Sequence, residues 1–241
     1  MDEKQAVPTA GRRPNARDAK RVARAAHAGL SVPYITRKIP FYEVLGEEGL
    51  TLIESNADTI LEEIGIEFRE DPEALSIWKA AGADVQGERV RMPRGMCRRL
   101  IQATAPREFT QLARNPARNV LIGGKNTVFA PAYGSPFIQN LDEGRRYARI
   151  EDFRNFVKLA YMSKSLHHSG GTICEPVDLP VNKRHFDMVY SHMKYSDKAF
   201  MGSVTHPERA TDTVEMAKML FGDGFMNAAT GRPNTVIVGL L

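Results

Sequence analysis

The sequence is poor in the residues and motifs that define several protein classes. Its 241 residues include two cysteines, Cys97 and Cys174, which cannot build a disulfide framework or a CxxC metal pair. No apolar run approaches the roughly 20 residues that span a bilayer. The basic N-terminal segment has no apolar core of the kind that secretory signals need. We therefore expect a cytoplasmic protein without disulfides or membrane spans.

Motifs of common nucleotide and hydrolase sites are also missing. There is no GxGxxG fingerprint, and Gly123–Asn126 lacks the glycine spacing and hydroxyl of a phosphate-binding loop. Neither Gly134–Pro136 nor His168–Gly170 forms a GxSxG nucleophile elbow. Residues 167–175 hold two histidines, a cysteine and a glutamate, but without the paired spacing of zinc sites. We therefore predict no nucleotide, serine-hydrolase or metal site.

Positive charge is concentrated at the N-terminus. Residues 1–38 carry nine Lys or Arg against three acidic residues, a balance of +6, whereas the whole chain has +4. The rest of the chain is therefore slightly acidic. We expect residues 1–38 to form a flexible basic tail. Docking to an acidic partner stays an alternative, and nucleic acid is disfavoured.

The next segment has a helical period. Apolar residues recur three and four apart from Leu50 to Ile64, and Gly65 follows as a C-cap. Asp71-Pro72 has the N-cap and first-residue pattern of a second helix, and a third begins near Pro93. Val85–Val90 brackets a tight hairpin. We expect residues 39–126 to form a helical cap with a small β-meander. The predicted meander strands are Phe109–Leu112, Val120–Ile122 and Val128–Ala130.

Strands and helices alternate in residues 127–241, which predicts a parallel sheet and an α/β fold. We expect these alternating elements to form about half of a (β/α)8 TIM barrel. Because the sequence stops within an apolar strand, we expect the barrel to be truncated. The predicted strands are Val128–Ala130, Leu166–Ile173, Ala199–Val204 and Thr235–Leu241. The predicted helices lie near Glu151–Met162, His185–Lys194 and Pro207–Leu220.

Candidate site residues lie in the loops that follow these strands, because barrel active sites form at the carboxyl ends of the strands. Gly170 and Gly171 allow a ligand to approach the backbone closely. Glu175 and Asp178 could hold a cation or cap backbone N–H groups, and both alternatives stay open. The candidates are Tyr133, Ser135, Phe137, Gln139, His168, Gly170, Gly171, Glu175, Asp178, Ser203 and Thr205.

Several segments together resemble the trimethylamine methyltransferase family, over about Ile39 to Leu241. The resemblance implies a (β/α)8 barrel that moves a methyl group from trimethylamine, or from a betaine-like quaternary amine, to the cobalt of a corrinoid protein, as in methylamine metabolism and methanogenesis. Members have chains about twice as long, which agrees with half a barrel. The segments are Ile39–Tyr42, Leu61–Phe68, Ile122–Gly124, Phe129–Ser135 and Ser169–Pro180.

The resemblance also implies how the site works. The corrinoid, a cobalamin, stays on a partner protein, so this chain binds no cofactor directly and needs no side-chain nucleophile. Pyrrolysine, where members insert it, lies in the second half of the barrel, outside this sequence. Tyr133 and Phe137 could hold the ammonium by their aromatic faces. Glu175 or Asp178 would add negative charge.

The rest of the amine substrate would be oriented by polar side chains. These are Gln139, His168, Ser203 and Thr205. A homo-oligomer is compatible with the sequence. Two other interpretations stay open: a non-catalytic remnant or split-gene product of such an enzyme, and an interaction module that uses the basic tail and the helical cap.

Overall fold

A computed structural model describes residues 35–222, 225 and 238–240. Its contacts divide the chain into two compact units. One is Arg37–Arg107, and the other contains Glu108 onward together with the residues up to Thr36. The short meander therefore shares a unit with the segments that follow it, whereas the sequence-based division fell at residue 126. Most of the predicted tail, residues 1–38, lies outside the described residues.

The Arg37–Arg107 unit contains the predicted long helix. α2 (Glu47–Thr59) continues into a π-helical turn, η1 (Ile60–Ile64), and ends at Gly65 with φ of 72°. A side chain at Gly65 would overlap the carbonyl oxygen of Val90. The predicted C-cap glycine is thus confirmed, because only glycine combines a positive φ with this close approach.

A small antiparallel sheet and two short helices complete this unit. β2 (Ile66–Glu67) pairs with β4 (Arg89–Arg91), which also pairs with β3 (Asp84–Gln86), so the predicted hairpin is confirmed. α3 (Pro72–Ala80) is capped by the Asp71 carboxylate, which accepts from the Ala74 N–H at 2.9 Å. α4 (Met96–Thr104) follows. The core of the unit is formed by Val90, Met92, Met96, Leu61, Phe68, Leu75 and Trp78.

The other unit begins with the meander. β5 (Glu108–Gln111) pairs antiparallel with β6 (Val120–Gly123), as predicted, across the 3-10 turn η2 (Pro116–Arg118). β7 (Asn126–Thr127) pairs with β1 (Ile35–Thr36). The prediction of a strand at Val128–Ala130 is wrong, since these residues have no regular secondary structure.

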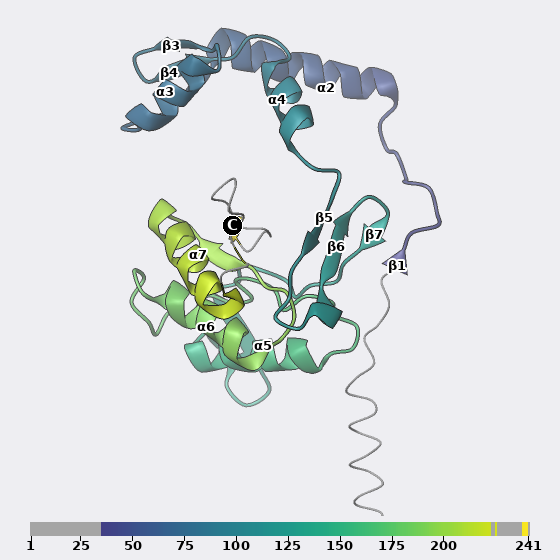
Figure 1. Ribbon diagram of the computed structural model, residues 1–241, viewed down its shortest axis with the longest axis vertical. Coiled ribbons are helices and arrows are strands. Elements are labelled where there is room, and N and C mark those ends of the chain that lie inside the picture. Colours follow the sequence, from purple (N-terminus) through teal and green to yellow (C-terminus); the bar gives the residue numbers. More distant parts are fainter. Residues whose placement is uncertain (1–34, 223–224, 226–237, 241) are drawn as a thin grey trace, which may run out of the picture. The chain divides into compact units, whose positions relative to one another are not determined.

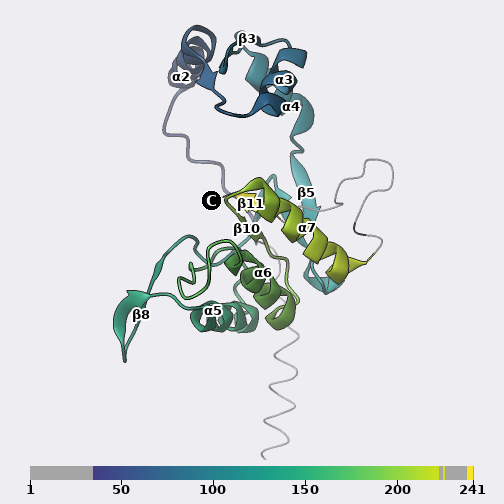
Figure 2. The ribbon, with the colours of Figure 1, turned by 90° about the vertical axis from the view of Figure 1, so that its left-hand side faces the viewer.

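Three helices of this unit match the predictions closely, and Figures 1 and 2 show them packed in chain order. They are α5 (Ile150–Met162), α6 (Arg184–Tyr195) and α7 (Pro207–Phe221). The strands match less well. Leu166–Ile173 forms no regular strand. Ala199–Val204 shortens to β10 (Gly202–Val204), which pairs in parallel with β11 (Val238–Leu240). Residues 235–237 and 241 of the last predicted strand lie outside the described residues.

The fold class is mixed α/β, as expected. The sheets of the described residues have two or three strands each and form no barrel, so the half-barrel stays a prediction. An antiparallel hairpin of β8 (Phe137–Asn140) and β9 (Gly144–Tyr147) was not expected. In Figure 2 it projects beyond α5. The core of this unit joins Phe153 and Val157 of α5 to Met188 of α6 and to Cys174. No helix of the described part is long and apolar enough to cross a membrane.

Candidate functional site

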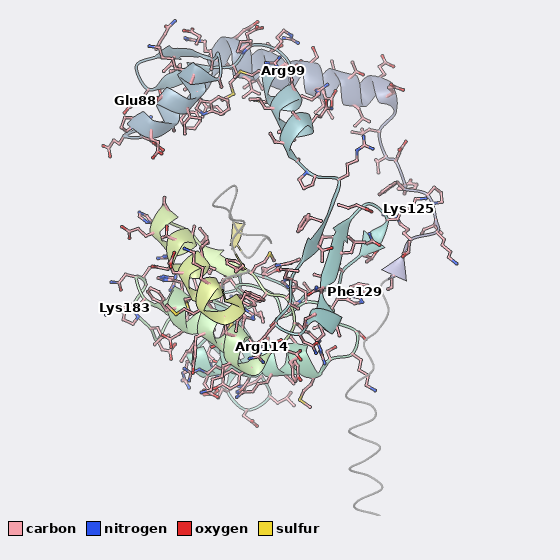
Figure 3. The ribbon with its side chains drawn as sticks, viewed as in Figure 1. Glu88, Arg99, Arg114, Lys125, Phe129 and Lys183 are labelled. Carbon is pink, nitrogen blue, oxygen red and sulfur yellow. The ribbon has the colours of Figure 1, made fainter. Side chains whose placement is uncertain are left out.

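Backbone hydrogen bonds place three candidate segments side by side in chain order. Phe129 is labelled in Figure 3. Its carbonyl oxygen accepts from the N–H groups of His167 and His168 at 2.9 and 3.2 Å. Ser135 and Cys174 form a parallel bridge further along the same two segments. The segment of residues 167–175 also pairs with the segment that begins at Ala199, because the Ser169 N–H donates to the Ala199 carbonyl at 2.8 Å. The segment of residues 167–175 therefore lies between residues 129–135 and residues 199–204.

The two glycines lie in the middle of this arrangement. Gly170 has φ of +96°, and its carbonyl oxygen accepts from Met201 N–H at 2.9 Å. A Cβ atom on Gly171 would lie 3.1 Å from Cε1 of Tyr133 and 3.4 Å from Cβ of Met201. The Tyr133 ring therefore packs on backbone that carries no side chain. We define the glycine turn as Gly170 and Gly171, and the candidate site as this turn with Tyr133 and Met201.

Tyr133 is suited to contact a ligand from this position. Its side chain is half-buried, with 41% relative exposure. Burial raises the pKa of its phenol above the ordinary value, so the ring stays protonated over the physiological range. The exposed part of an aromatic ring offers a ligand a flat, electron-rich surface without charge.

His168, a predicted site residue, lies inside the protein with partners of its own. It is 2% exposed, and both ring nitrogens have protein partners. Nδ1 accepts from Gly170 N–H at 2.8 Å, and Nε2 lies 3.1 Å from Oε1 of Gln111. The Gln111 amide then donates to the Phe200 carbonyl at 2.9 Å. His168 therefore supports the turn from within the protein, and its nitrogens are already occupied.

A second buried histidine, His192 of α6, contacts the other side of the turn. Its Nε2 lies 2.9 Å from the carbonyl oxygen of Gly171, and its Nδ1 lies 2.8 Å from Oγ of Ser169. The ring also stacks on Phe200, with centroids 5.7 Å apart. Burial lowers the pKa of His168 to about 3 and that of His192 to about 4. Both imidazoles are therefore neutral near pH 7.

The two acidic candidates have partners within the protein. Glu175 forms an ion pair with Arg184 at the start of α6. Asp178 Oδ1 accepts from the Ile150 N–H at 2.9 Å, which caps the N-terminus of α5. Asp178 therefore caps a backbone N–H group, which is one of the two alternatives given for it. The charge of Glu175 is compensated by Arg184.

Three candidates after Tyr133 lie in or beside the hairpin. Ser135 Oγ donates to the Phe137 carbonyl at 2.7 Å. The Phe137 ring contacts Tyr147 at a centroid distance of 4.6 Å and has the Arg145 guanidinium above it at 4.1 Å. Gln139 is exposed on β8, opposite Arg145. Phe137 and Gln139 therefore make hairpin contacts, whereas Tyr133 packs on the glycine turn.

The last two candidates lie at the end of β10. Ser203 is buried within the strand. Thr205 is exposed, and its hydroxyl is hydrogen-bonded to Arg209, which also donates to the Val181 carbonyl at 2.9 Å. Arg209 thus ties the end of β10 to the loop before α6. Among the described residues, no hydrogen bond joins Ser203 or Thr205 to the glycine turn.

Sequence reasoning missed the residues that support the turn from a distance. Gln111 lies on β5, 57 residues before its partner His168. His192 shares a buried face of α6 with His185, Met188 and Val189. That spacing of three, four and seven residues is readable from the sequence and marks a helix face that carries histidines into the interior. Nothing in the sequence identifies the Gly171 carbonyl as the partner of His192.

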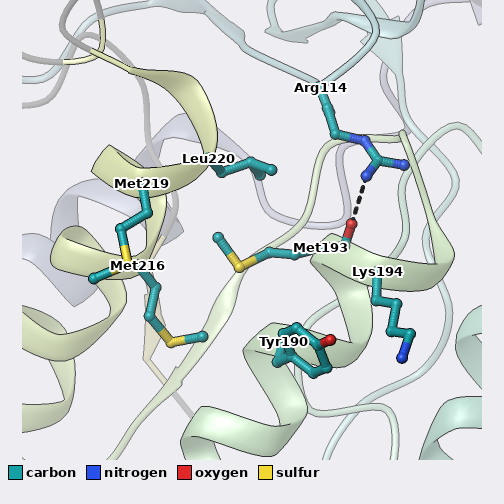
Figure 4. Close-up of a pocket in the computed structure, with 7 residues that line it drawn as sticks. All are labelled: Arg114, Tyr190, Met193, Lys194, Met216, Met219 and Leu220. Carbon is teal, nitrogen blue, oxygen red and sulfur yellow. Dashed lines mark hydrogen bonds between the residues drawn. The ribbon is translucent and has the colours of Figure 1, made fainter.

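A separate surface groove of about 460 Å3 lies between α6 and α7 (Figure 4). Arg114 donates to the Met193 carbonyl at its edge, at 2.8 Å. None of the predicted site residues lines it. Among the described residues, no group of three His, Cys, Asp or Glu side chains is arranged to hold a metal ion. The groove is lined by Arg114, Tyr190, Met193, Lys194, Met216, Met219 and Leu220.

Comparison with known proteins defines the family. The family model described as Trimethylamine methyltransferase (MTTB) matches residues 10–240. The chain belongs to the trimethylamine methyltransferase family. A curated relative, the glycine betaine methyltransferase of Desulfitobacterium hafniense (strain Y51), is 50% identical over 184 residues, which is 76% of this chain. The match covers 38% of the relative, so the aligned part of the chain corresponds to well under half of that protein.

Proposed function

We propose that this chain is part of a methyltransferase that takes a methyl group from a quaternary amine of the glycine betaine type. The single observation that carries the proposal is the 50% identity over 184 residues to a protein named glycine betaine methyltransferase. The methyl acceptor in this proposal is the cobalt of a corrinoid, held by a separate partner protein. Trimethylamine is the alternative substrate, in keeping with the family description.

The chemistry of the candidate site supports a quaternary ammonium. Such a cation has no N–H group, so hydrogen-bond acceptors cannot select it, and an aromatic face is its usual partner. Tyr133 supplies that face, because its side chain is 41% exposed and its ring packs on the buried backbone of Gly171. Glu175 and Asp178 have partners already, so aromatic contact would provide more of the selectivity than charge pairing.

The proposed reaction breaks one bond and forms one. The C–N bond to a methyl carbon breaks, and its electron pair stays on nitrogen, so the quaternary ammonium leaves as a neutral tertiary amine. The corrinoid supplies the nucleophile when it is bound. The residues of this chain would bind the ammonium, align the departing methyl group and keep water away. No proton transfer is required, which agrees with a site whose histidines are buried and neutral.

Calorimetric titration of the purified full gene product tests the binding step. Glycine betaine should bind more tightly than 3,3-dimethylbutanoate, in which carbon replaces the charged nitrogen. Tyr133→Leu should weaken betaine binding about tenfold, because a cation–π contact contributes about 1–2 kcal/mol. It should change the binding of the neutral-headed analogue much less. Tyr147→Leu, on the hairpin, is the matched control and should leave both affinities unchanged. Equal affinity for the two ligands would remove the cation site.

The transfer step is measured separately. The full gene product is incubated with glycine betaine and a reduced corrinoid protein, and methylation is followed from the absorption spectrum of the corrinoid. Formation of dimethylglycine in equal amount supports the proposal. Binding of betaine without transfer would support the non-catalytic alternative instead.

A further inference from the structure

The glycine turn is held by two imidazoles from opposite sides. The N–H of Gly170 donates to Nδ1 of His168 at 2.8 Å. The carbonyl of Gly171 accepts from Nε2 of His192 at 2.9 Å. One turn therefore has both an N–H and a carbonyl group paired with imidazoles, and the Gly171 carbonyl also accepts from the Ile173 N–H at 2.9 Å.

These partners determine the tautomer of each ring. A backbone N–H only donates, so Nδ1 of His168 is unprotonated and its Nε2 carries the hydrogen, which points to Oε1 of Gln111. A carbonyl only accepts, so Nε2 of His192 carries the hydrogen and Nδ1 accepts from Ser169 Oγ. Every nitrogen of the two rings therefore has one defined role.

The surroundings hold both rings in place. His192 is 1% exposed, lies edge-on to Phe153 at 5.3 Å and stacks on Phe200 at 5.7 Å. His168 is connected through Gln111 to the carbonyl of Phe200, on the neighbouring segment. Two rings with fixed positions and fixed tautomers define where the peptide groups between them lie.

We infer that His168 and His192 are positioning residues that fix the buried glycine turn, and through it the Tyr133 ring that packs on Gly171 and receives the methylammonium group. The assignment of a methylammonium group as the ligand rests on the proposed function. Neither histidine touches the substrate. Both act through the turn, and a charge on either ring would repel a bound cation.

Paired substitutions separate this role from a structural one. His168→Asn keeps an acceptor near the Nδ1 position for Gly170 N–H, whereas His168→Gln moves its polar group to the Nε2 position and leaves that N–H unpaired. His192→Gln keeps a donor for the Gly171 carbonyl, whereas His192→Asn does not. All four variants remove one imidazole, so each pair loses similar packing. Thermal melting of the full gene product measures that shared loss.

Steady-state kinetics with glycine betaine give the first readout. His168→Gln and His192→Asn should raise KM about tenfold, the equivalent of one lost hydrogen bond, with kcat changed less than about threefold. His168→Asn and His192→Gln should stay within about threefold of the wild-type KM. The positioning role would be overturned if KM changed in proportion to the loss of melting temperature in all four variants, regardless of whether the hydrogen-bonding atom is kept.

Hydrogen exchange gives a readout that does not depend on activity. The Gly170 amide should lose protection in His168→Gln and keep it in His168→Asn. If the wild-type protein neither binds nor demethylates any amine, the proposed function fails, and so does the assignment of a methylammonium ligand. The exchange data then still decide whether the histidines fix the turn. If the wild-type enzyme is active and exchange is equal within each pair, the positioning role alone is overturned.

Discussion

The ammonium group of Lys198 donates to the carbonyl oxygen of Ala160, at 2.7 Å, from a buried position. The same Nζ atom donates to the carbonyls of Ser163 at 2.9 Å and Leu166 at 2.7 Å. These carbonyls belong to the last turn of α5 and the chain just after it, where a helix has no hydrogen-bond donors of its own. One lysine therefore caps α5 from the segment that precedes β10. The positive charge also complements the negative end of the helix dipole.

Lys198→Met should lower the free energy of unfolding by roughly 2–4 kcal/mol, because it leaves buried carbonyls without a donor. Lys164→Met, an exposed lysine two residues after α5, is the matched control and should change stability by less than about 0.5 kcal/mol. Urea denaturation followed by circular dichroism measures both. Equal stability of the two variants would contradict the capping role.

Acid should destabilise the protein through His168 and His192. Burial lowers the pKa of both imidazoles, to about 3 and about 4, from the value near 6.5 of the unfolded chain. Below pH 6.5 the unfolded chain therefore binds protons that the folded chain does not. The free energy of unfolding falls as the pH drops from 6.5 towards 4, by at most about 1.4 kcal/mol per pH unit for each histidine. Above pH 6.5 these groups cause no change.

Urea denaturation between pH 7 and pH 4.5 checks this expectation. His192→Gln should reduce the slope of stability against pH, because it removes one of the two groups. His206→Gln, which removes an exposed histidine, should leave the slope as it is. Identical slopes in all three proteins would show that the buried histidines do not control the acid response.

The ion pair between Arg146 and Asp152 should stabilise the protein. Two guanidinium nitrogens of Arg146 donate to the Asp152 carboxylate at 2.7 and 2.9 Å, and the Arg149 N–H donates to it at 2.8 Å. Arg146 lowers the pKa of Asp152 below its ordinary value, so this contribution is present above pH 3.8 and is lost as the pH falls further.

Asp152→Asn should cost roughly 1–3 kcal/mol at pH 7, because it removes a bidentate ion pair and weakens the cap of α5. The comparison is Asp142→Asn, at the exposed tip of the hairpin, which should be neutral. Thermal melting distinguishes them. Melting temperatures within error of each other would refute the importance of the pair.

Two glycines of the Arg37–Arg107 unit should respond in opposite directions to alanine. Gly49→Ala lies within α2, where a new Cβ would meet Leu45 at an ordinary 3.7 Å, and should stabilise the helix by up to about 1 kcal/mol. Gly65→Ala should destabilise by more than about 1 kcal/mol, because of its positive φ and the overlap with Val90. Calorimetric melting measures both, and the same sign for the two would contradict the backbone description.

The sequence predicted helices better than strands, for a physical reason. α5, α6 and α7 have one buried face each, so their apolar residues recur at the helical period. Leu166–Ile173 contains an apolar and polar mixture with two glycines, and the positive φ of Gly170 turns the chain out of an extended path. Such a turn depends on partners such as His192, which lies 21 residues beyond Gly171. Local pattern cannot supply that information.

The same limit applies to the candidate site. Loop position alone selected Tyr133, Gly170 and Gly171, and the structure packs the Tyr133 ring on Gly171. It could not show that Glu175 pairs with Arg184, or that Asp178 caps α5. Side chains with strong hydrogen-bonding capacity are as useful for holding loops as for binding ligands, and only their neighbours distinguish these roles.

Asp178 links the loop of residues 175–180 to the start of α5, which limits how the length of this loop can vary. It belongs to the loop between residues 175 and 180, yet it caps α5, whose first residue Ile150 lies 28 positions earlier. Inserting or deleting one residue between Glu175 and Asp178 would break the register of either the Arg184 ion pair or the cap. Surface loops usually tolerate changes in length. Natural variation in this loop should therefore occur by substitution at constant length.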